Sequence, residues 1–194
     1  MNNLTVDNKK IGVIQGDYLG YYNAKLPDSP LSNFYFVPQG FYIWIYPNKE
    51  MVSPTPVKEE KGVHKGKFVS VEQVFAFGKA YEMGDKKSMS QIYKLQTKDS
   101  VQYKELGRKV RNYNDNLWQS VSFEWMKIGM MAKFDQDEFS KKALLATKKL
   151  NLIEANPNDN QWGGHCSLQD DFTKATGLNK QGKLLMEVRN ALSN

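Results

Sequence analysis

Hydrophobic and polar residues follow two different spacings along the chain, and the change falls near residue 70. In the region 11–46, apolar residues alternate with polar ones or cluster with aromatic and β-branched neighbours, which is typical of strands. The apolar positions that carry this prediction are Ile11, Val13, Phe41, Ile43 and Ile45, and the region is punctuated by Gly16, Gly20 and Gly40. We therefore expect a small antiparallel sheet near the N-terminus.

The segment from Pro47 to Lys67 breaks both spacings. It combines mixed charges with prolines and glycines, namely Pro47, Pro54, Pro56, Gly62 and Gly66. Such residues mark turns and loops, and a loop of this length is uncommon inside a compact domain. We expect an exposed loop or arm over residues 47–67 that has a local role.

From Ser70 onward the apolar residues recur with the period of helices. Ser70 followed by Gln73 three positions later is a capping box, and the apolar residues after it fall on one helical face. Further helices are predicted after Asp85, after Asp99, over 117–128, after Asp135 with Glu138, and over 184–192. A short strand is expected over 152–155 and a turn-rich loop over 156–171. The predicted fold is a mostly helical α+β single domain over residues 1–194.

Composition and charge suggest where the protein works. Cys166 is the only cysteine, so no internal disulfide forms, and a reducing compartment is expected. The first ten residues are polar, and no stretch approaches the roughly 20 apolar residues that cross a bilayer. We expect a soluble, cytoplasmic protein that does not associate with membranes. The net charge of +6 permits a phosphate-bearing partner, but solvated basic helix faces explain it equally well.

Glu72 is the first candidate for chemistry. With Ser70 as the helix cap, it occupies the second helical position, where the helix dipole stabilises a carboxylate by about 0.3–1 kcal/mol. An ionised carboxylate can deprotonate water, and it can stabilise the positive charge that develops on ribose when an N-glycosidic bond breaks. Acidic residues are also common in first turns for dipole reasons alone, so the position leaves both interpretations open.

The segment 159–164 is the second candidate, because a tryptophan followed by two glycines is unusual in a polar loop. The face of Trp162 offers a stacking platform for a base or a ribose, and Gly163 allows backbone N–H groups to approach a ligand. Asp159 is placed to bind ribose hydroxyls or to assist Glu72. The alternative is a tight turn in which Trp162 fills the core.

Other polar residues have weaker individual signals. Asn33 either hydrogen-bonds a ligand or caps its own turn. Lys79 lies seven residues after Glu72, on the same side of the predicted helix, and either holds a phosphate or is solvated. Arg108 and Arg111 are further phosphate candidates. His64 and His165 are the only histidines and lack metal-site spacing, so we expect no metal; His165 is at most a weak ligand contact.

A set of short segments follows a distinctive order and spacing along the chain, from about Pro30 to Leu192. They are Leu31-Ser32-Asn33-Phe34, Ser70-Val71-Glu72-Gln73, Phe77-Gly78-Lys79-Ala80, Leu106-Gly107-Arg108 with Trp118, Met131-Ala132-Lys133-Phe134 with Gln136, Leu152-Ile153-Glu154, Asn158-Asp159 with Trp162-Gly163, and Asn179 with Gly182 before 184–189. Each element alone is common, but the ordered set is specific. It resembles the NADAR (YbiA-like) family.

The resemblance implies a YbiA-like fold, hydrolysis of N-glycosidic bonds and no cofactor. Some members of the family act on a ribosylaminopyrimidine phosphate of riboflavin synthesis, and others remove ADP-ribose from guanine bases. It makes Glu72 the leading catalytic residue, with Asp159 as helper. The residues then expected to bind substrate are Asn33, Phe34, Lys79, Arg108, Trp118, Trp162, Gly163 and Asn179.

The expected partner is a small molecule containing ADP-ribose or ribose phosphate, or an ADP-ribosylated nucleic acid. This chain departs from the family at Gln73, where many relatives have histidine, and in the lengths of segments 47–67 and 164–179. The substrate therefore stays open between ADP-ribosylated guanine and the riboflavin intermediate. The non-enzymatic alternatives are a module that senses ADP-ribose or NAD, and a structural partner protein that uses its arm.

Overall fold

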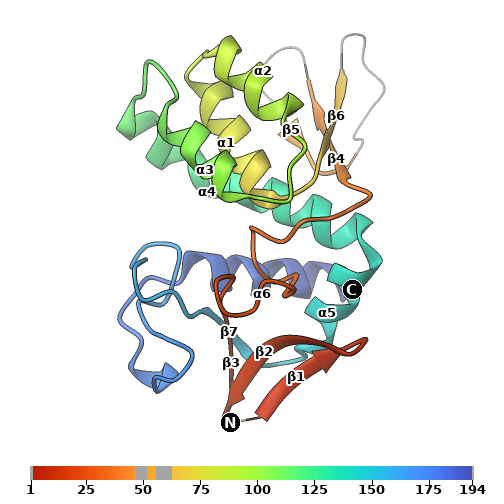
Figure 1. Ribbon diagram of the computed structural model, residues 1–194, viewed down its shortest axis with the longest axis vertical. Coiled ribbons are helices and arrows are strands. Elements are labelled where there is room, and N and C mark those ends of the chain that lie inside the picture. Colours follow the sequence, from red (N-terminus) through yellow and green to blue (C-terminus); the bar gives the residue numbers. More distant parts are fainter. Residues whose placement is uncertain (1, 47–51, 56–62, 194) are drawn as a thin grey trace. The chain divides into compact units, whose positions relative to one another are not determined.

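A computed structural model describes residues 2–46, 52–55 and 63–193 (Figure 1). The chain divides into two compact units. Unit 1 comprises residues 1–35 and 138–194, and unit 2 comprises residues 36–137. The chain is α+β, as predicted, whereas its organisation as a single domain stays a prediction.

Unit 1 is built on a four-stranded sheet in the order β1-β2-β3-β7. The strands are β1 (Asn2–Val6), β2 (Lys9–Gln15), β3 (Tyr18–Tyr21) and β7 (Asn151–Glu154). The first three are joined by tight turns and are antiparallel, whereas β7 runs parallel to β3 and pairs Glu154 with Tyr21. Asp7 and Asn8 have positive φ, which matches the right-handed twist of a two-residue hairpin.

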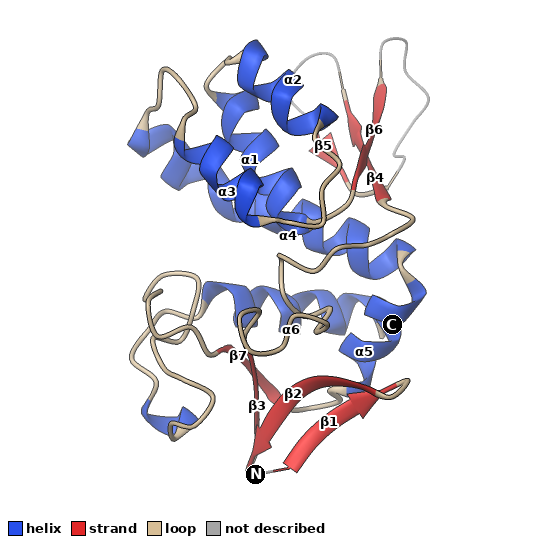
Figure 2. Ribbon diagram, viewed as in Figure 1, coloured by secondary structure: helices blue, strands red, loops and turns tan. Residues whose placement is uncertain are grey.

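Two helices and a short turn complete unit 1 (Figure 2). Helix α6 (Lys180–Leu192) contacts β7, and α5 (Glu138–Ala146) contacts both α6 and β1. The 3-10 turn η1 (Phe172–Lys174) places the Phe172 ring where a Cβ on Gly20 would lie, so glycine is required for this packing. One buried cluster of the unit consists of Val13, Leu26, Ile153, Ala155, Cys166, Leu168 and Phe172.

In its described residues, 36–46, 52–55 and 63–137, unit 2 pairs a three-stranded antiparallel sheet with four helices. The sheet has the order β5-β4-β6, formed by β5 (Val52–Ser53), β4 (Phe41–Ile45) and β6 (His64–Phe68). The helices are α1 (Val71–Glu82), α2 (Lys86–Lys94), α3 (Val101–Arg108) and α4 (Asp115–Gln136). Helix α1 contacts the other three, and it is therefore buried on most of its circumference.

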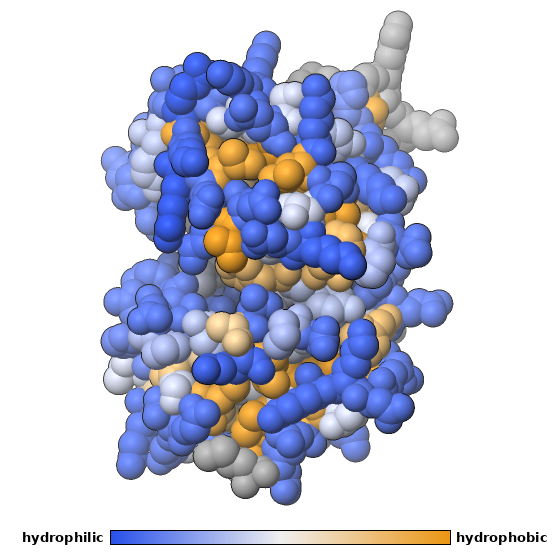
Figure 3. Space-filling view, viewed as in Figure 1, coloured by the Kyte–Doolittle hydropathy of each residue, from blue (hydrophilic) through white to orange (hydrophobic). Residues whose placement is uncertain are grey.

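Glycines let α1 and α4 approach closely. A Cβ on Gly78 of α1 would overlap the Trp125 ring of α4, and one on Gly129 would lie 3.2 Å from both Val71 and Val74. Apolar side chains therefore pack closely at these two points, which favours one rotation of α1 about its own axis. Hydrophilic side chains predominate on the face drawn in Figure 3, as expected around such cores.

The structure corrects several sequence-based boundaries. Asp135 does not begin a helix: α4 continues through it, because Phe134 stays buried and Gln136 bonds both the N–H and the C=O of Tyr42 at 2.8 Å. Strand β1 was not predicted. The segment expected to be an exposed loop contains β5 and most of β6, while its residues 47–51 and 56–62 lie outside the described part.

Candidate active site

Helix α1 carries the leading catalytic candidate. Ser70 caps the helix as predicted, with its Oγ accepting from the Gln73 N–H at 3.2 Å. Glu72 follows in the first turn and is only 7% exposed. A carboxylate is rarely buried to this extent unless it has partners or a function, so Glu72 is not simply a solvated first-turn acid.

Gln73 has a structural role. Its side chain is fully buried; Oε1 accepts from the Val69 N–H at 2.9 Å, and Nε2 lies 3.0 Å from the Ile92 carbonyl and 3.2 Å from that of Leu95. In a capping box this amide would return to the N–H of the cap residue, but here it binds one residue earlier. Gln73 therefore joins the start of α1 to the end of α2.

Lys79 lies on the Glu72 side of α1, two turns later. Its Nζ is 5.0 Å from the ring centroid of Tyr113 and 5.2 Å from that of Trp118, within cation–π range. Trp118 is 5% exposed and packs its edge against Phe75 with centroids 4.8 Å apart. The aromatic rings thus position the ammonium group beside the Glu72 side of the helix.

Charges around Lys79 define its electrostatics. Partial burial lowers the pKa of Lys79, the Glu72 carboxylate opposes this, and the Arg108 guanidinium lowers the pKa further. Arg108 comes close because Gly107, in the preceding position of α3, packs on Ala76 of α1. Glu72, Lys79 and Arg108 therefore form an acid–base cluster next to aromatic rings, which we call the α1 cluster together with Trp118.

In unit 1, Asp159 organises the Trp-Gly-Gly loop. Its Oδ1 accepts from the N–H groups of Gln161 at 2.9 Å and Trp162 at 2.8 Å. Trp162 is half-buried, and the Lys180 ammonium lies 5.8 Å from its ring centroid. One carboxylate oxygen of Asp159 is thus engaged in a turn, and a catalytic contribution from this residue stays a prediction.

The same loop caps helix α6. The N–H groups of Asn179, Lys180 and Gln181 donate to the carbonyls of residues 163, 161 and 162 at 3.0–3.2 Å. The Asn179 side chain accepts from the Glu154 N–H at 3.1 Å and donates to the Leu152 carbonyl at 2.8 Å, which extends the pairing along β7. Gly163 has no room for a Cβ, because the Asp159 and Glu154 carbonyls lie 2.9 and 3.2 Å from that position.

The remaining predicted residues of unit 1 lie in the turn after β3. Asn33 is buried, and Phe34 is half-buried with its N–H bonded to the Ser32 hydroxyl at 3.1 Å.

The predicted site residues fall into two groups. Glu72, Lys79, Arg108 and Trp118 belong to unit 2, and Asn33, Phe34, Asp159, Trp162, Gly163 and Asn179 belong to unit 1. That both groups line one pocket stays a prediction.

Two of the weaker predictions belong elsewhere. The Arg111 guanidinium pairs with Asp85 at 2.7 Å, so it is engaged in a structural ion pair. The exposed His165 has its Nδ1 3.2 Å from the Thr176 hydroxyl. Among the described residues, no three His, Cys, Asp or Glu side chains gather closely enough to hold a metal ion.

Sequence reasoning missed a buried polar group at the carboxyl ends of β3 and β7. Gln181 is 1% exposed, and neither its amide atoms nor the buried Tyr21 hydroxyl have a hydrogen-bond partner in the part of the chain that the structure describes. Burial raises the pKa of Tyr21 well above its usual value, the Glu154 carboxylate raises it further, and the neighbouring Gln181 side chain opposes this. Buried polar atoms without partners are uncommon and call for an explanation, such as a ligand.

The burial of Lys133 of α4 was not predicted either, because the residue was recognised only as part of the segment 131–134. It is fully buried, with its Nζ 4.4 Å from the ring centroid of Phe134. Burial lowers its pKa to about 7, against the opposing effect of Asp137. Lysines of this kind are enriched at functional sites, but the sequence gives no sign of one, because helical lysines are ordinarily exposed.

Comparisons with known proteins give the site its context. The sequence matches the NADAR domain over residues 21–193. N-glycosidase R617 of Acanthamoeba polyphaga mimivirus is 33% identical over 132 residues, covering 66% of this chain and 76% of that protein. Protein irg-1 of Caenorhabditis elegans is 32% identical over 167 residues, covering 83% of this chain and 74% of that protein.

The comparison of the fold with solved structures agrees with the match to the NADAR domain. The structure is similar to the NMR structure of YbiA from E. coli with a TM-score of 0.63, covering 94% of this chain and 89% of that one at 23% identity. The α+β arrangement is therefore the YbiA fold. No helix in residues 2–46, 52–55 and 63–193 is long and apolar enough to cross a membrane. Because the domain match spans nearly the whole sequence, the chain belongs to the NADAR family.

Proposed function

We propose that this protein hydrolyses the N-glycosidic bond between ribose and guanine in an ADP-ribosylated guanine base, nucleotide or nucleic acid. The broader class follows from the family: relatives are named N-glycosidases, so the chain is a hydrolase acting on N-glycosyl compounds. The identity of the substrate and a cytoplasmic setting are the parts that we add. The net charge of +6 favours a phosphate-bearing substrate.

The observation that carries the proposal is the α1 cluster. It combines a buried carboxylate, a partly desolvated lysine and an arginine on adjoining helices, next to the rings of Trp118 and Tyr113. A carboxylate with two nearby cations suits a substrate that carries phosphates and develops positive charge at ribose. In a sensor that only bound the ligand, the carboxylate would serve only to accept hydrogen bonds from ribose hydroxyls.

In the proposed reaction Glu72 accepts a proton from water as the water oxygen bonds to the anomeric carbon. The bond from that carbon to the base nitrogen breaks, its electron pair stays on the nitrogen, and the nitrogen takes up a proton from solvent, while Glu72 later returns its own proton to solvent. The Glu72 carboxylate also stabilises the positive ribose in the transition state. Lys79 and Arg108 hold phosphate, Trp162 and Phe34 hold the base or ribose, and Asp159 assists.

The test is Glu72→Gln, which keeps the size of the side chain and removes its charge. We expect turnover of guanine-linked ADP-ribose to fall by about 100-fold or more, while ADP-ribose binding largely survives. Glu82→Gln is the matched control: it lies on the same helix, accepts from the Trp125 Nε1 at 2.7 Å and keeps an acceptor after substitution. Turnover there should stay within about twofold of the unmodified protein.

The ribosylaminopyrimidine phosphate of riboflavin synthesis is assayed in parallel. Faster turnover of that compound than of guanine-linked ADP-ribose would replace the proposed substrate and leave the N-glycosidase class intact. No turnover of either, with ADP-ribose still bound, would instead support a sensor.

A further inference from the structure

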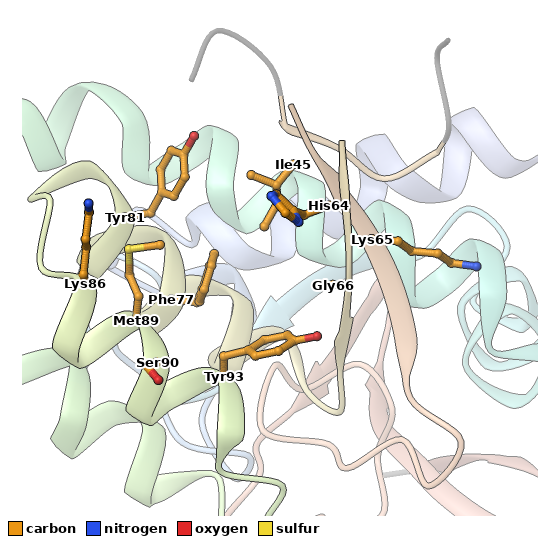
Figure 4. Close-up of a pocket in the computed structure, with 10 residues that line it drawn as sticks. All are labelled: Ile45, His64, Lys65, Gly66, Phe77, Tyr81, Lys86, Met89, Ser90 and Tyr93. Atoms are coloured by element: carbon orange, nitrogen blue, oxygen red, sulfur yellow. The ribbon is translucent and has the colours of Figure 1, made fainter. Parts of the chain in front are cut away.

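Unit 2 contains a cavity that the proposed function does not use (Figure 4). It has a volume of about 480 Å³, within the range of small-molecule sites. Phe77, Tyr81, Met89 and Tyr93 from α1 and α2 form one side, and β6 forms the other. Gly66 of β6 lies in this wall, and a Cβ there would lie 2.9 Å from the Phe68 ring, so a larger residue would disturb the packing.

This cavity lies on the other side of α1 from the α1 cluster. At about 100° per residue, Phe77 and Tyr81 point about 140–180° away from Glu72 around the helix axis. Gly78, between Phe77 and Lys79, is covered by Trp125 of α4. A molecule in the cavity would therefore contact neither Glu72 nor Lys79.

The aromatic lining is held rigidly by ring-to-ring packing. Phe77 and Tyr81 have centroids 6.3 Å apart with nearly parallel planes, Phe77 lies 6.2 Å from Tyr93, and Tyr81 packs edge-on against Trp125 at 5.5 Å. Phe77 and Tyr81 are 6% and 8% exposed, so Tyr93, at 38%, presents most of the accessible ring surface to a flat heteroaromatic ring. A purely aliphatic ligand would gain less from this geometry than a nucleobase.

The charges at the rim favour an anion. Lys86 and His64 contribute cationic or titratable groups, Ser90 contributes a hydroxyl, and none of the described lining residues is acidic. Lys65 is directed away from the cavity, since its Nζ lies 4.1 Å from the ring centroid of Tyr42. Phosphate binding is therefore assigned to Lys86, which is exposed at the start of α2.

We propose that this cavity binds a free mononucleotide, with its base against Phe77, Tyr81 and Tyr93 and its phosphate at Lys86. The site is distinct from the proposed active site, so a nucleotide bound here and a substrate at Glu72 occupy the protein together. Its natural ligand is identified only by this chemistry, a planar base that carries a phosphate.

The test follows the Met89 methyl group by NMR in protein labelled at its methionine methyls, with the Met89 signal assigned through Met89→Leu. AMP, adenosine and ribose 5-phosphate are titrated separately. We expect AMP to shift the Met89 signal saturably, and to bind at least about tenfold more tightly than either fragment. A Met89 signal that AMP does not move would overturn the proposal, whatever the activity at Glu72.

Substitutions at two exposed lining residues, Ser90 and Lys86, test where the ligand binds. Ser90→Trp fills the cavity and Lys86→Ser removes its cation, and each should weaken AMP binding by about tenfold or more. Lys87→Ser is the matched control, because Lys87 is the exposed neighbour of Lys86 and does not line the cavity. Equal binding in Lys86→Ser and Lys87→Ser would remove the phosphate assignment. A single-stranded oligonucleotide that binds more tightly than AMP would replace the mononucleotide with a nucleic acid.

Discussion

At the scale of single residues, Lys79 is the clearest test of phosphate binding. Its ammonium lies 5.0 Å from the ring centroid of Tyr113 and 5.2 Å from that of Trp118, so an apolar side chain of similar length would still contact both rings. We expect Lys79→Met to raise the KM for an ADP-ribosylated substrate about 10- to 100-fold with a smaller effect on kcat, because a ground-state phosphate contact is lost. Steady-state kinetics measure this, with exposed Lys94→Met as control. An unchanged KM in Lys79→Met would assign the phosphate to other residues.

Removal of the Tyr21 hydroxyl tests whether this buried group serves substrate binding or stability. It is buried, and among the described residues it has only a contact with the Gln181 side chain that falls outside ordinary hydrogen-bond geometry, so its removal costs little. Tyr21→Phe should therefore change the free energy of unfolding by less than about 1 kcal/mol, or increase it. If the hydroxyl serves the substrate, kcat/KM falls at least about tenfold in the same variant, which corresponds to one lost hydrogen bond. Urea unfolding and kinetics are measured on one preparation; unaltered kinetics would leave Tyr21 out of the site.

At the scale of elements, the join between α1 and α2 rests on Gln73. Gln73→Leu keeps the volume but leaves the Val69 N–H and the carbonyls at the end of α2 buried without their amide partner. We expect a loss of about 2–4 kcal/mol in the free energy of unfolding. Urea denaturation measures it, with the exposed Gln91→Leu of α2 as control. A loss equal to that of the control would show that the three backbone groups find other partners.

Elements were predictable where their signals are local. The Ser70 and Asp85 caps act on N–H groups within three residues, and both begin helices as predicted. Asp99 was predicted one residue early, since Ser100 is the cap position and Asp99 accepts from the Val101 N–H. Strand β6 was missed, because its alternation includes Gly66 and three polar residues and because it pairs with distant residues of β4, from Ile45 with His64 to Phe41 with Phe68. Pairing over such a separation leaves no local pattern.

At the scale of the whole molecule, the fold class and family followed from the sequence, but the division of the predicted site residues between two compact units did not. An ordered set of motifs identifies a family without showing that Glu72 and Trp162 belong to different compact units. Nor does it show that Asp159 and Asn179 already bond the backbone around α6, because these bonds depend on the three-dimensional course of the 159–164 loop. The residue types thus predicted the class of reaction, whereas the hydrogen-bond partners of Asp159 and Asn179 became clear only from the three-dimensional structure.

Acid stability is a property of the whole molecule that one carboxylate should dominate. Asp85 is 2% exposed, caps α2 through Ser88, and accepts from both the backbone and the guanidinium of Arg111. Bonds to Arg111 first, and to Ser88 next, hold the pKa of Asp85 well below its usual value. A depressed folded-state pKa gives stability that is complete above the unfolded value of about 3.9 and is lost as the pH falls below it.

We therefore expect the contribution of Asp85 to the free energy of unfolding to be constant near neutral pH. Below about pH 4 this contribution should fall steadily. Asp85→Asn should cost about 2–4 kcal/mol at pH 7, because it removes the charge that the Arg111 bonds need, and the difference should shrink at pH 3 and below. Urea unfolding followed by tryptophan fluorescence reports mainly on unit 2, which holds Trp44, Trp118 and Trp125. Exposed Asp28→Asn serves as control. If the curves of Asp85→Asn and the unmodified protein stay parallel from pH 7 to 3, the Asp85–Arg111 pair is not the source of acid sensitivity.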